Sequence, residues 1–136
     1  DDWAKFFDRN TAIEVNEKVH RIDFLKALRT YRIQLNLFRS HNVNSHNMRS
    51  FEVPAIGGIM LAPRTVEHTA FFEDEKEVFY YDDFSNCVEQ CKKILSMSET
   101  EVNLIREAAR RRSIDSKYAY SERADAMLEK IYTLGE

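Results

Sequence analysis

Residues 33–68, IQLNLFRSHNVNSHNMRSFEVPAIGGIMLAPRTVEH, contain the pattern that decides the fold. Two runs of strand length, 33–38 and 59–62, are each followed by a polar segment that leads toward a short helix. The expected strands are apolar on both faces, which is typical of strands buried in a parallel sheet. We therefore expect a parallel sheet whose strands are joined and covered by helices, which is an α/β fold.

The helix between the two strands has recognisable ends. Residues 47–56 look helical, and Pro54, which lacks an N–H, favours a helix that begins close to Ser50. The glycine pair at 57–58 suits a helix end that needs a left-handed residue. The second strand can then begin close to the end of the helix.

Further elements follow on both sides of this unit. They are a short strand over 12–15, a helix within residues 21–31 that starts from Asp23 as its N-cap, a short helix from about Thr65, a strand over 77–81, a helix capped by Asp82, Asp83 or Ser85, a helix opened by a capping box of Ser98 and Glu101, and a last helix capped by Asp115 or Ser116. A chain of 136 residues and 16.1 kDa can build one hydrophobic core. We therefore expect a single domain over residues 1–136.

Apolar residues at three- and four-residue spacing predict the buried faces of the C-terminal helices. The expected stripes are Phe84, Cys87, Val88, Cys91, Ile94 and Leu95; Val102, Ile105, Ala108 and Ala109; and Tyr120, Ala124, Met127, Leu128, Ile131 and Leu134. A metal pair or a redox couple is the functional alternative for Cys87 and Cys91. We favour core packing, because a thiol serves as a small apolar side chain and the segment offers no further ligands.

The charge pattern argues against several classes of partner. The net charge is −3, from 20 basic and 23 acidic residues that are well mixed, so the overall field favours neither nucleic acid nor an anionic lipid surface. The three arginines at 110–112 fit the solvated face of a helix. No apolar stretch approaches the roughly 18 to 20 residues of a membrane span. The N-terminal residues lack a secretory-signal pattern, so the cytoplasm is the expected compartment.

Metal and cofactor motifs are not found in the sequence. The four histidines, His20, His41, His46 and His68, have no metal-site spacing, and each lies in a segment expected to be exposed. The chain has no GxSxG elbow, no GxxxxGK phosphate loop and no GxGxxG fingerprint. We therefore predict no metal and no cofactor, and the catalytic residues stay unassigned.

Polar side chains gather where the two expected strands end. In an open parallel sheet, ligands bind beyond the carboxyl ends of the strands, where loops lead into helix N-termini. Asn, Ser and Arg side chains there can donate to a phosphate, and the Glu52 carboxylate can accept from two vicinal hydroxyls. An oxyanion with sugar hydroxyls beside it is one interpretation. The other is that Asn and Ser cap a helix whose dipole favours an acidic residue in its first turn.

Three segments within residues 31–134 carry a resemblance to a known family. They are YRIQLNLFR (31–39), NSHNMRSFEVPAIGGIMLAPRTVEHTAFFEDEKEVFYYDD (44–83), and a helical tail with EAARRR (107–112) and KYAYSERADAML (117–128). They resemble the C-terminal region of the CgeB-like glycosyltransferases, within the GT-B enzymes that are similar to group 1. The most specific part is RSFEVPAIGGIML followed at a fixed distance by FFEDEKEVFYY.

This resemblance implies part of a two-domain enzyme whose Rossmann-like C-terminal half binds a nucleotide-sugar donor. Glu52 matches the glutamate that holds the donor ribose, and Arg49, with Asn44, Ser45 and the helix start, stands where the diphosphate is expected. Group 1 enzymes carry another glutamate where this chain has Asn44, so a carboxylate contact to the sugar is not assumed. The residues expected to bind the donor are Asn44, Ser45, Asn47, Arg49, Glu52, Arg64 and Thr65.

The resemblance also implies features outside these residues. Basic residues that group 1 enzymes place on an earlier strand for the diphosphate have no identified counterpart, and the N-terminal acceptor domain is missing from the chain. Transfer in GT-B enzymes relies on protein cations and helix dipoles rather than a metal. The sheet is expected to be incomplete, with apolar edges that a partner chain or a swapped homodimer would cover.

A different class of function stays open beside this one. A noncatalytic α/β interaction domain would keep the fold while its polar loop only caps a helix, and a nucleic-acid module is a more distant third. The sequence leaves the sugar, the nucleobase, the acceptor and the stereochemistry of transfer undetermined.

Overall fold

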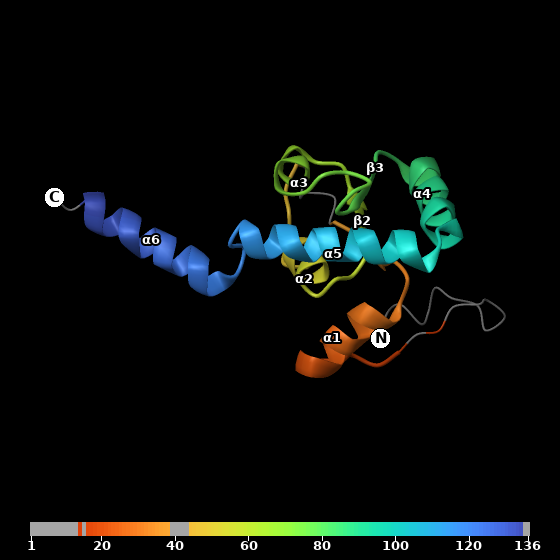
Figure 1. Ribbon diagram of the computed structural model, residues 1–136, viewed down its shortest axis with the longest axis horizontal. Helices are drawn as coiled ribbons and strands as arrows, with labels where there is room; N and C mark the ends of the chain where they lie inside the picture. The colour runs from red at the N-terminus through yellow and green to blue at the C-terminus, as the bar shows by residue number, and fades with distance from the viewer. Residues whose placement is uncertain (1–13, 15, 39–43, 135–136) are drawn as a thin grey trace.

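The structure, a computed structural model, describes residue 14, residues 16–38 and residues 44–134 (Figure 1). The strand expected over 12–15 and much of the polar loop, residues 39–43, lie outside these described residues. In chain order the elements are α1 (Arg21–Thr30), β1 (Gln34–Leu35), α2 (Arg49–Ala55), β2 (Met60–Pro63), α3 (Val66–Phe71), β3 (Phe79–Tyr81), α4 (Phe84–Ser96), α5 (Glu99–Asp115) and α6 (Tyr120–Leu134).

The three strands form one parallel sheet in the order β1, β2, β3. Gln34 lies opposite Met60, and Leu61 lies opposite Phe79. Each strand is followed by at least one helix before the next strand begins, and the helices flank the sheet. The α/β prediction is confirmed, and the arrangement is consistent with a Rossmann-like half of a GT-B fold. The strands are shorter than the sequence indicated, since the runs 33–38 and 77–81 contribute only two and three residues.

The short helix α2 and the glycine pair behave as the sequence predicts. The helix begins within one residue of Ser50 and ends directly after Pro54. Gly57 adopts the left-handed φ of 73°. Gly58 donates its N–H to the Val53 carbonyl at 2.8 Å, and a Cβ on Gly58 would lie 2.8 Å from Cγ1 of Val53. The strand β2 therefore begins so close to α2 that a side chain at position 58 has no room.

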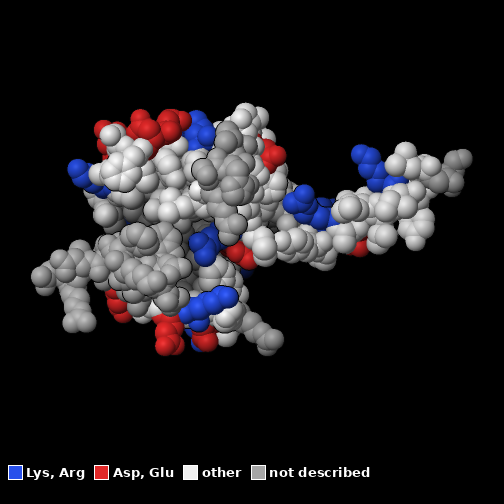
Figure 2. Space-filling view, turned by 180° about the vertical axis from the view of Figure 1, so that it is seen from behind, with Lys and Arg blue, Asp and Glu red and all other residues white. Residues whose placement is uncertain are grey.

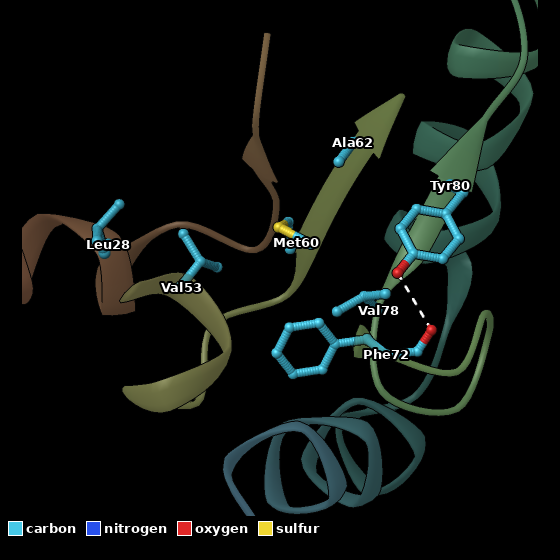
Figure 3. Packing of buried hydrophobic residues seen from close by; sticks show 7 residues of the cluster. All are labelled: Leu28, Val53, Met60, Ala62, Phe72, Val78 and Tyr80. Atoms are coloured by element: carbon cyan, nitrogen blue, oxygen red, sulfur yellow. Dashed lines mark hydrogen bonds between the residues drawn. The ribbon is translucent and has the colours of Figure 1, made fainter. Parts of the chain in front are cut away.

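Alternate residues of β2 face two apolar clusters, one on each face of the sheet, as the two-residue period of a strand requires. The cluster toward α1, α2 and the segment after α3, shown in Figure 3, contains Leu28, Val53, Met60, Ala62, Phe72, Val78 and Tyr80. The cluster toward α4 and α5 contains Ile59, Leu61, Phe79, Ile94, Val102 and Ile105. The core is thus divided by the sheet into two layers, each closed by helices.

The predicted stripes of α4 and α5 are buried only in part. On α4, Ile94 is fully buried and the two cysteines are half-buried against the second cluster, as expected for core packing. Its other stripe residues, Phe84, Val88 and Leu95, are exposed. On α5, which packs against α2 in Figure 1, three of the four predicted residues are buried and Ala108 is half-buried. A thirteen-residue helix on a sheet of short strands meets too little surface to cover a wide stripe.

The last helix departs most from the prediction. No residue of α6, all of which the structure describes, is buried, and the helix projects from the body in Figures 1 and 2. The expected caps Asp115 and Ser116 are instead the last residue and the C-cap of α5. The apolar stripe of α6 has no covering surface among the described residues. Met127 and Ile131 of this stripe are 67% and 61% exposed. Spacing predicts that a helix has an apolar face, but not what lies against it.

One smaller correction concerns the cap of α1, while the caps of α4 and α5 and the charge pattern agree with the sequence. Asp23 is not the N-cap of α1, because His20 holds that position and Asp23 lies in the first turn. The predicted helix start near Thr65 is confirmed, and Thr65 is the N-cap of α3. Capping of α4 by Asp83, one of the three candidates, and of α5 by its capping box is also confirmed. The arginines 110–112 are exposed as expected. On the face seen in Figure 2, acidic and basic side chains are interspersed.

Candidate functional site

The loops that follow β1 and β2 meet at the carboxyl end of the sheet, as predicted. Thr65, which caps α3, donates its hydroxyl to the Ser45 carbonyl at 3.1 Å. The imidazole Nδ1 of His46 pairs with the Glu67 carboxylate on α3. Because β1 and β2 are parallel neighbours, their carboxyl ends lie at the same edge of the sheet. The two polar segments chosen from the sequence therefore form one surface.

A buried polar network lies beneath this surface and joins β1 to α2. Asn47 donates its side-chain amide to Oδ1 of Asn36 at 2.8 Å, and its own Oδ1 accepts from the Ser50 N–H at 3.2 Å. The Ser50 hydroxyl oxygen accepts from the Asn47 N–H at 3.1 Å and from Nδ2 of Asn36 at 3.3 Å. Asn36 and Ser50 are 1% and 0% exposed. These bonds satisfy polar groups that have no access to water and fix where α2 begins.

The expectation that His68 is exposed is wrong, because its side chain is fully buried between β2 and α3. Its Nδ1 lies 2.8 Å from the Pro63 carbonyl oxygen, which can only accept, so Nδ1 carries the proton. Its Nε2 lies 2.8 Å from Oγ of Ser50. The ring stacks on Tyr80 at 5.7 Å. Burial is the main cause that lowers the pKa of His68, so the imidazole is neutral at neutral pH and Nε2 accepts from the hydroxyl.

Arg49 and Glu52 lie on an open part of the surface, three residues apart on one face of α2. Both line a hollow of about 700 Å³, which is within the size range of small-molecule sites. The Arg49 guanidinium lies 5.8 Å from the centre of the Phe24 ring of α1. The lining residues are Glu17, Lys18, Val19, His20, Phe24, Asn47, Met48, Arg49 and Glu52.

Three N–H groups in the first turn of α2 are already bonded within the chain. The amide of Ser50 donates to the Asn47 carbonyl at 3.1 Å. The amides of Phe51 and Glu52 donate to the Met48 carbonyl at 3.1 and 3.0 Å. The sequence suggested that this helix start would meet a phosphate. With these three amides occupied, an anion in the hollow would be held by the cationic side chains of Arg49 and Lys18.

Comparison with known proteins gives this surface a context. Residues 1–129 match the family described as glycosyl transferase-like. The chain belongs to this family. No curated protein and no solved structure matched the chain. Family membership supports a transferase whose general activity is glycosyl transfer, and it implies a nucleotide-sugar donor.

In this glycosyl transferase-like chain, three residues predicted to bind the donor lie on the two polar loops, and two of them bond to other residues of the chain. Asn44 is exposed and has a left-handed φ of 61°. Ser45 is half-buried and donates its hydroxyl to the His46 carbonyl at 3.2 Å. Thr65 is 7% exposed and accepts from the His68 N–H in its capping role. The main observed task of Ser45 and Thr65 is to join the two loops.

Arg64 is directed toward the β3 side of the structure. It donates to Asp74 at 2.6 Å and to Asp82 at 3.1 Å. The hydrogen bond with Asp74 is the main cause that raises the pKa of Arg64. Its guanidinium carbon also lies 5.5 Å from the Tyr80 ring centre. A ligand phosphate would have to compete with two carboxylates for this guanidinium.

Glu52 also lines a second hollow, of about 420 Å³, whose walls are largely aromatic. It is lined by His46, Asn47, Met48, Phe51, Glu52, Tyr118, Tyr120 and Arg123. The Arg123 guanidinium lies 5.9 Å from the Phe51 ring centre. Glu52 therefore lies at the border of the larger hollow, whose charged side chains are Glu17, Lys18, Arg49 and Glu52 itself, and this second, aromatic hollow.

Sequence reasoning missed the partners that α1 and its preceding segment bring to the site. Lys18, His20 and Phe24 share the larger hollow with Arg49 and Glu52, although they lie far away in the sequence. The only sequence signal was the helical spacing of Phe24, which indicated a packed face rather than a site. The resemblance implies basic residues for the diphosphate on an earlier strand, and the sequence shows no counterpart of them. Lys18 is a basic residue in the hollow, although it does not lie on a strand.

Within residues 16–38 and 44–134, no three His, Cys, Asp or Glu side chains gather closely enough to hold a metal ion. In the same part of the chain, no helix has both the length and the apolar character needed to cross a membrane.

Proposed function

We propose that this chain is the donor-binding part of a GT-B glycosyltransferase of the CgeB-like type. It would hold a nucleotide-diphosphate sugar whose sugar is transferred to an acceptor hydroxyl, without the help of a bound metal ion. The observation that carries the proposal is that Glu52, Arg49 and Lys18 share one open hollow beside the carboxyl end of the sheet. Nucleotide ligands bind at this edge in α/β folds.

The side chains of the hollow match the parts of a nucleotide. The Glu52 carboxylate can accept from both hydroxyls of a ribose, which are a vicinal pair. Arg49 and Lys18 supply two positive charges for a diphosphate. Phe24 offers an aromatic face in the same hollow. Asn44 and Ser45 complete the proposed contacts on the loop, with Asn47, Thr65 and Arg64 in the next layer, where their present bonds hold the loops.

These groups explain how the site would assist transfer. An acceptor oxygen attacks the anomeric carbon, the bond to the diphosphate breaks, and negative charge grows on the departing phosphate. Fixed cations near that phosphate stabilise the growing charge and therefore lower the barrier. In this proposal the acceptor and the group that takes its proton belong to a second domain, so this chain alone would bind donor without turnover.

Titration with UDP, GDP and ADP, and with their sugar conjugates, tests the proposal by calorimetry and NMR. We expect at least one nucleotide to shift signals of residues 44–67. Glu52→Gln and Arg49→Gln should each weaken binding by about 10- to 100-fold, since a hydrogen bond to a charged group contributes about 1.5 to 3 kcal/mol. EDTA should leave the affinity unchanged.

Arg64→Gln provides the matched control, because Arg64 is also a loop arginine but is held by Asp74 and Asp82. We expect it to weaken nucleotide binding less than Arg49→Gln does. If no nucleotide shifts these signals, or if Glu52→Gln binds like the wild type, the donor-binding proposal fails and the noncatalytic interaction domain gains support.

A further inference from the structure

His68 is a buried titratable group for which the proposed function has no use, although it contacts the element that carries the site. We propose that neutral His68 is a positioning residue that acts through Ser50 to hold the start of α2, and with it Arg49 and Glu52, in the arrangement that binds the nucleotide. The nucleotide in this inference rests on the proposed function. The contacts that support the positioning role of His68 do not depend on that function.

Both ring nitrogens of His68 are occupied in opposite roles. Nδ1 donates to the Pro63 carbonyl, and Nε2 accepts from the Ser50 hydroxyl, each at 2.8 Å. Only a neutral imidazole with its proton on Nδ1 satisfies both partners, because a protonated ring has two donors and no acceptor. The side chain is 0% exposed, so water cannot replace a lost partner.

The Ser50 hydroxyl could turn its proton toward Oδ1 of Asn47 at 3.4 Å, but this would not free its oxygen to accept from a protonated His68. Its oxygen already accepts from the Asn47 N–H and from Nδ2 of Asn36, which uses both lone pairs of a hydroxyl. A proton on Nε2 of His68 would therefore face an oxygen that has no free acceptor site. The conflict would be relieved only if Ser50 or its neighbours move.

Movement of Ser50 would be transmitted to the proposed ligands. Ser50 is the second residue of α2, directly after Arg49 and two residues before Glu52. Its N–H also donates to Oδ1 of Asn47, the residue that ties the loop to Asn36 on the β1 side. Displacement of Ser50 would thus disturb the loop and the first turn of the helix together, without any contact between His68 and the nucleotide.

The groups around His68 determine the direction of its pH response. Burial dominates and lowers its pKa below the ordinary value of 6.5. Among the described residues, His46 on the loop lowers this pKa further, Glu67 on α3 raises it, and Tyr80 on β3 stacks on the ring with its hydroxyl bonded elsewhere. The pKa of His68 is lower in the folded protein than in the unfolded chain. The stability contributed by neutral His68 is therefore present above about pH 6.5, and it is lost as the pH falls toward the folded-state pKa.

Two amide substitutions separate the bond to Ser50 from the bond to Pro63. The amide of glutamine reaches the position of Nε2, so His68→Gln can keep an acceptor for the Ser50 hydroxyl and cannot take up a proton. The amide of asparagine reaches only the position of Nδ1, so His68→Asn can keep the Pro63 bond and loses Ser50. If His68 acts through Ser50, the glutamine variant should bind nucleotide as the wild type does, and the asparagine variant should bind more weakly.

The experiment measures the dissociation constants of UDP, GDP and ADP between about pH 8 and about pH 5, the range in which histidines titrate. For the nucleotide that binds, we expect wild-type affinity to fall about tenfold toward the acid end, as one unsatisfied buried bond predicts. His68→Gln should stay within about threefold across the range. His68→Asn should bind about tenfold more weakly than the wild type at about pH 8, and its affinity should also change by no more than about threefold toward the acid end. Both series are repeated with His46→Asn, because the His46 side chain lies on the same loop and pairs with Glu67 of α3.

NMR distinguishes positioning from a general loss of structure. Long-range nitrogen–proton spectra should show a neutral His68 protonated on Nδ1, and the amide signals of residues 47–52 should titrate together with its ring. Equal pH profiles for wild type and His68→Gln, or a ring protonated on Nε2, would overturn the inference. If no nucleotide binds at any pH, the proposed function fails, while the amide signals still decide whether His68 holds the start of α2.

Discussion

Substitution of Gly58 by alanine should destabilise the fold by about 2 to 3 kcal/mol, at the upper end of the range for overpacking a filled core. A Cβ at this position would lie 2.8 Å from Cγ1 of Val53 and 3.1 Å from the Val53 carbonyl oxygen. Val53 is 1% exposed, so its side chain has no open space to enter. The carbonyl also accepts the Gly58 N–H at 2.8 Å, so the backbone cannot withdraw without breaking that bond.

Gly57→Ala is the matched control. Gly57 is the neighbour of Gly58 in the chain, but its restraint is its backbone conformation rather than a close contact. Its φ of 73° strains an alanine, but the nearest atom to an added Cβ is the Arg106 carbonyl oxygen at 3.8 Å, an ordinary contact. Only the left-handed conformation is costly there, by about 1 kcal/mol. The alanine at position 58 should therefore cost more than the alanine at position 57.

Urea unfolding followed by circular dichroism measures both free energies of unfolding. Val53→Ala removes the methyl group at 2.8 Å but not the carbonyl, so Gly58→Ala should cost less in that background, although still more than zero. Equal costs for the two glycine substitutions would refute the reasoning. Strict additivity of Gly58→Ala with Val53→Ala would show that the side-chain contact is not the source of the strain.

The remaining predictions concern two hydrogen-bonded supports of the fold. Tyr80→Phe should lower the free energy of unfolding by about 1 to 2 kcal/mol, since the buried Tyr80 hydroxyl donates to the His68 carbonyl at 2.7 Å, as measured by urea unfolding. Burial raises the pKa of Tyr80, so this loss should not vary around neutral pH, and a pH-dependent loss would contradict it. Ser98→Ala should cost about 1 kcal/mol by thermal unfolding, because it removes the acceptor that caps α5, whereas Ser98→Thr should stay close to wild type. A larger loss in the threonine variant than in the alanine variant would argue against capping.

Features that depend on residues close in the chain were predicted from the sequence. The strand, helix and strand around the glycine pair follow from local spacing, from Pro54 and from the left-handed φ of Gly57. The cap of α5 and the candidate cap Asp83 of α4 were also predicted, because a cap bonds an N–H only three residues away. Parallel strands followed from the alternation of strands and helices, and their shared edge predicted that the two polar loops would meet.

Features that depend on which surfaces meet were decided by the tertiary structure. Lys18 and Phe24 join Glu52 only because α1 packs beside α2, and His68 is buried only because α3 lies against the end of β2. Arg64 is held by two acidic residues from beyond α3, which no local pattern indicates.

The sequence by itself therefore determined the order and type of the elements, the glycine-dependent turn and the position of the polar loops, since these arise from interactions within a few residues. Only the tertiary structure decided which side chains share the hollow, which histidine is buried and neutral, and which helix faces stay exposed. Those outcomes depend on the packing of helices against a sheet of short strands, and packing joins residues whose separation along the chain carries no signal of their contact.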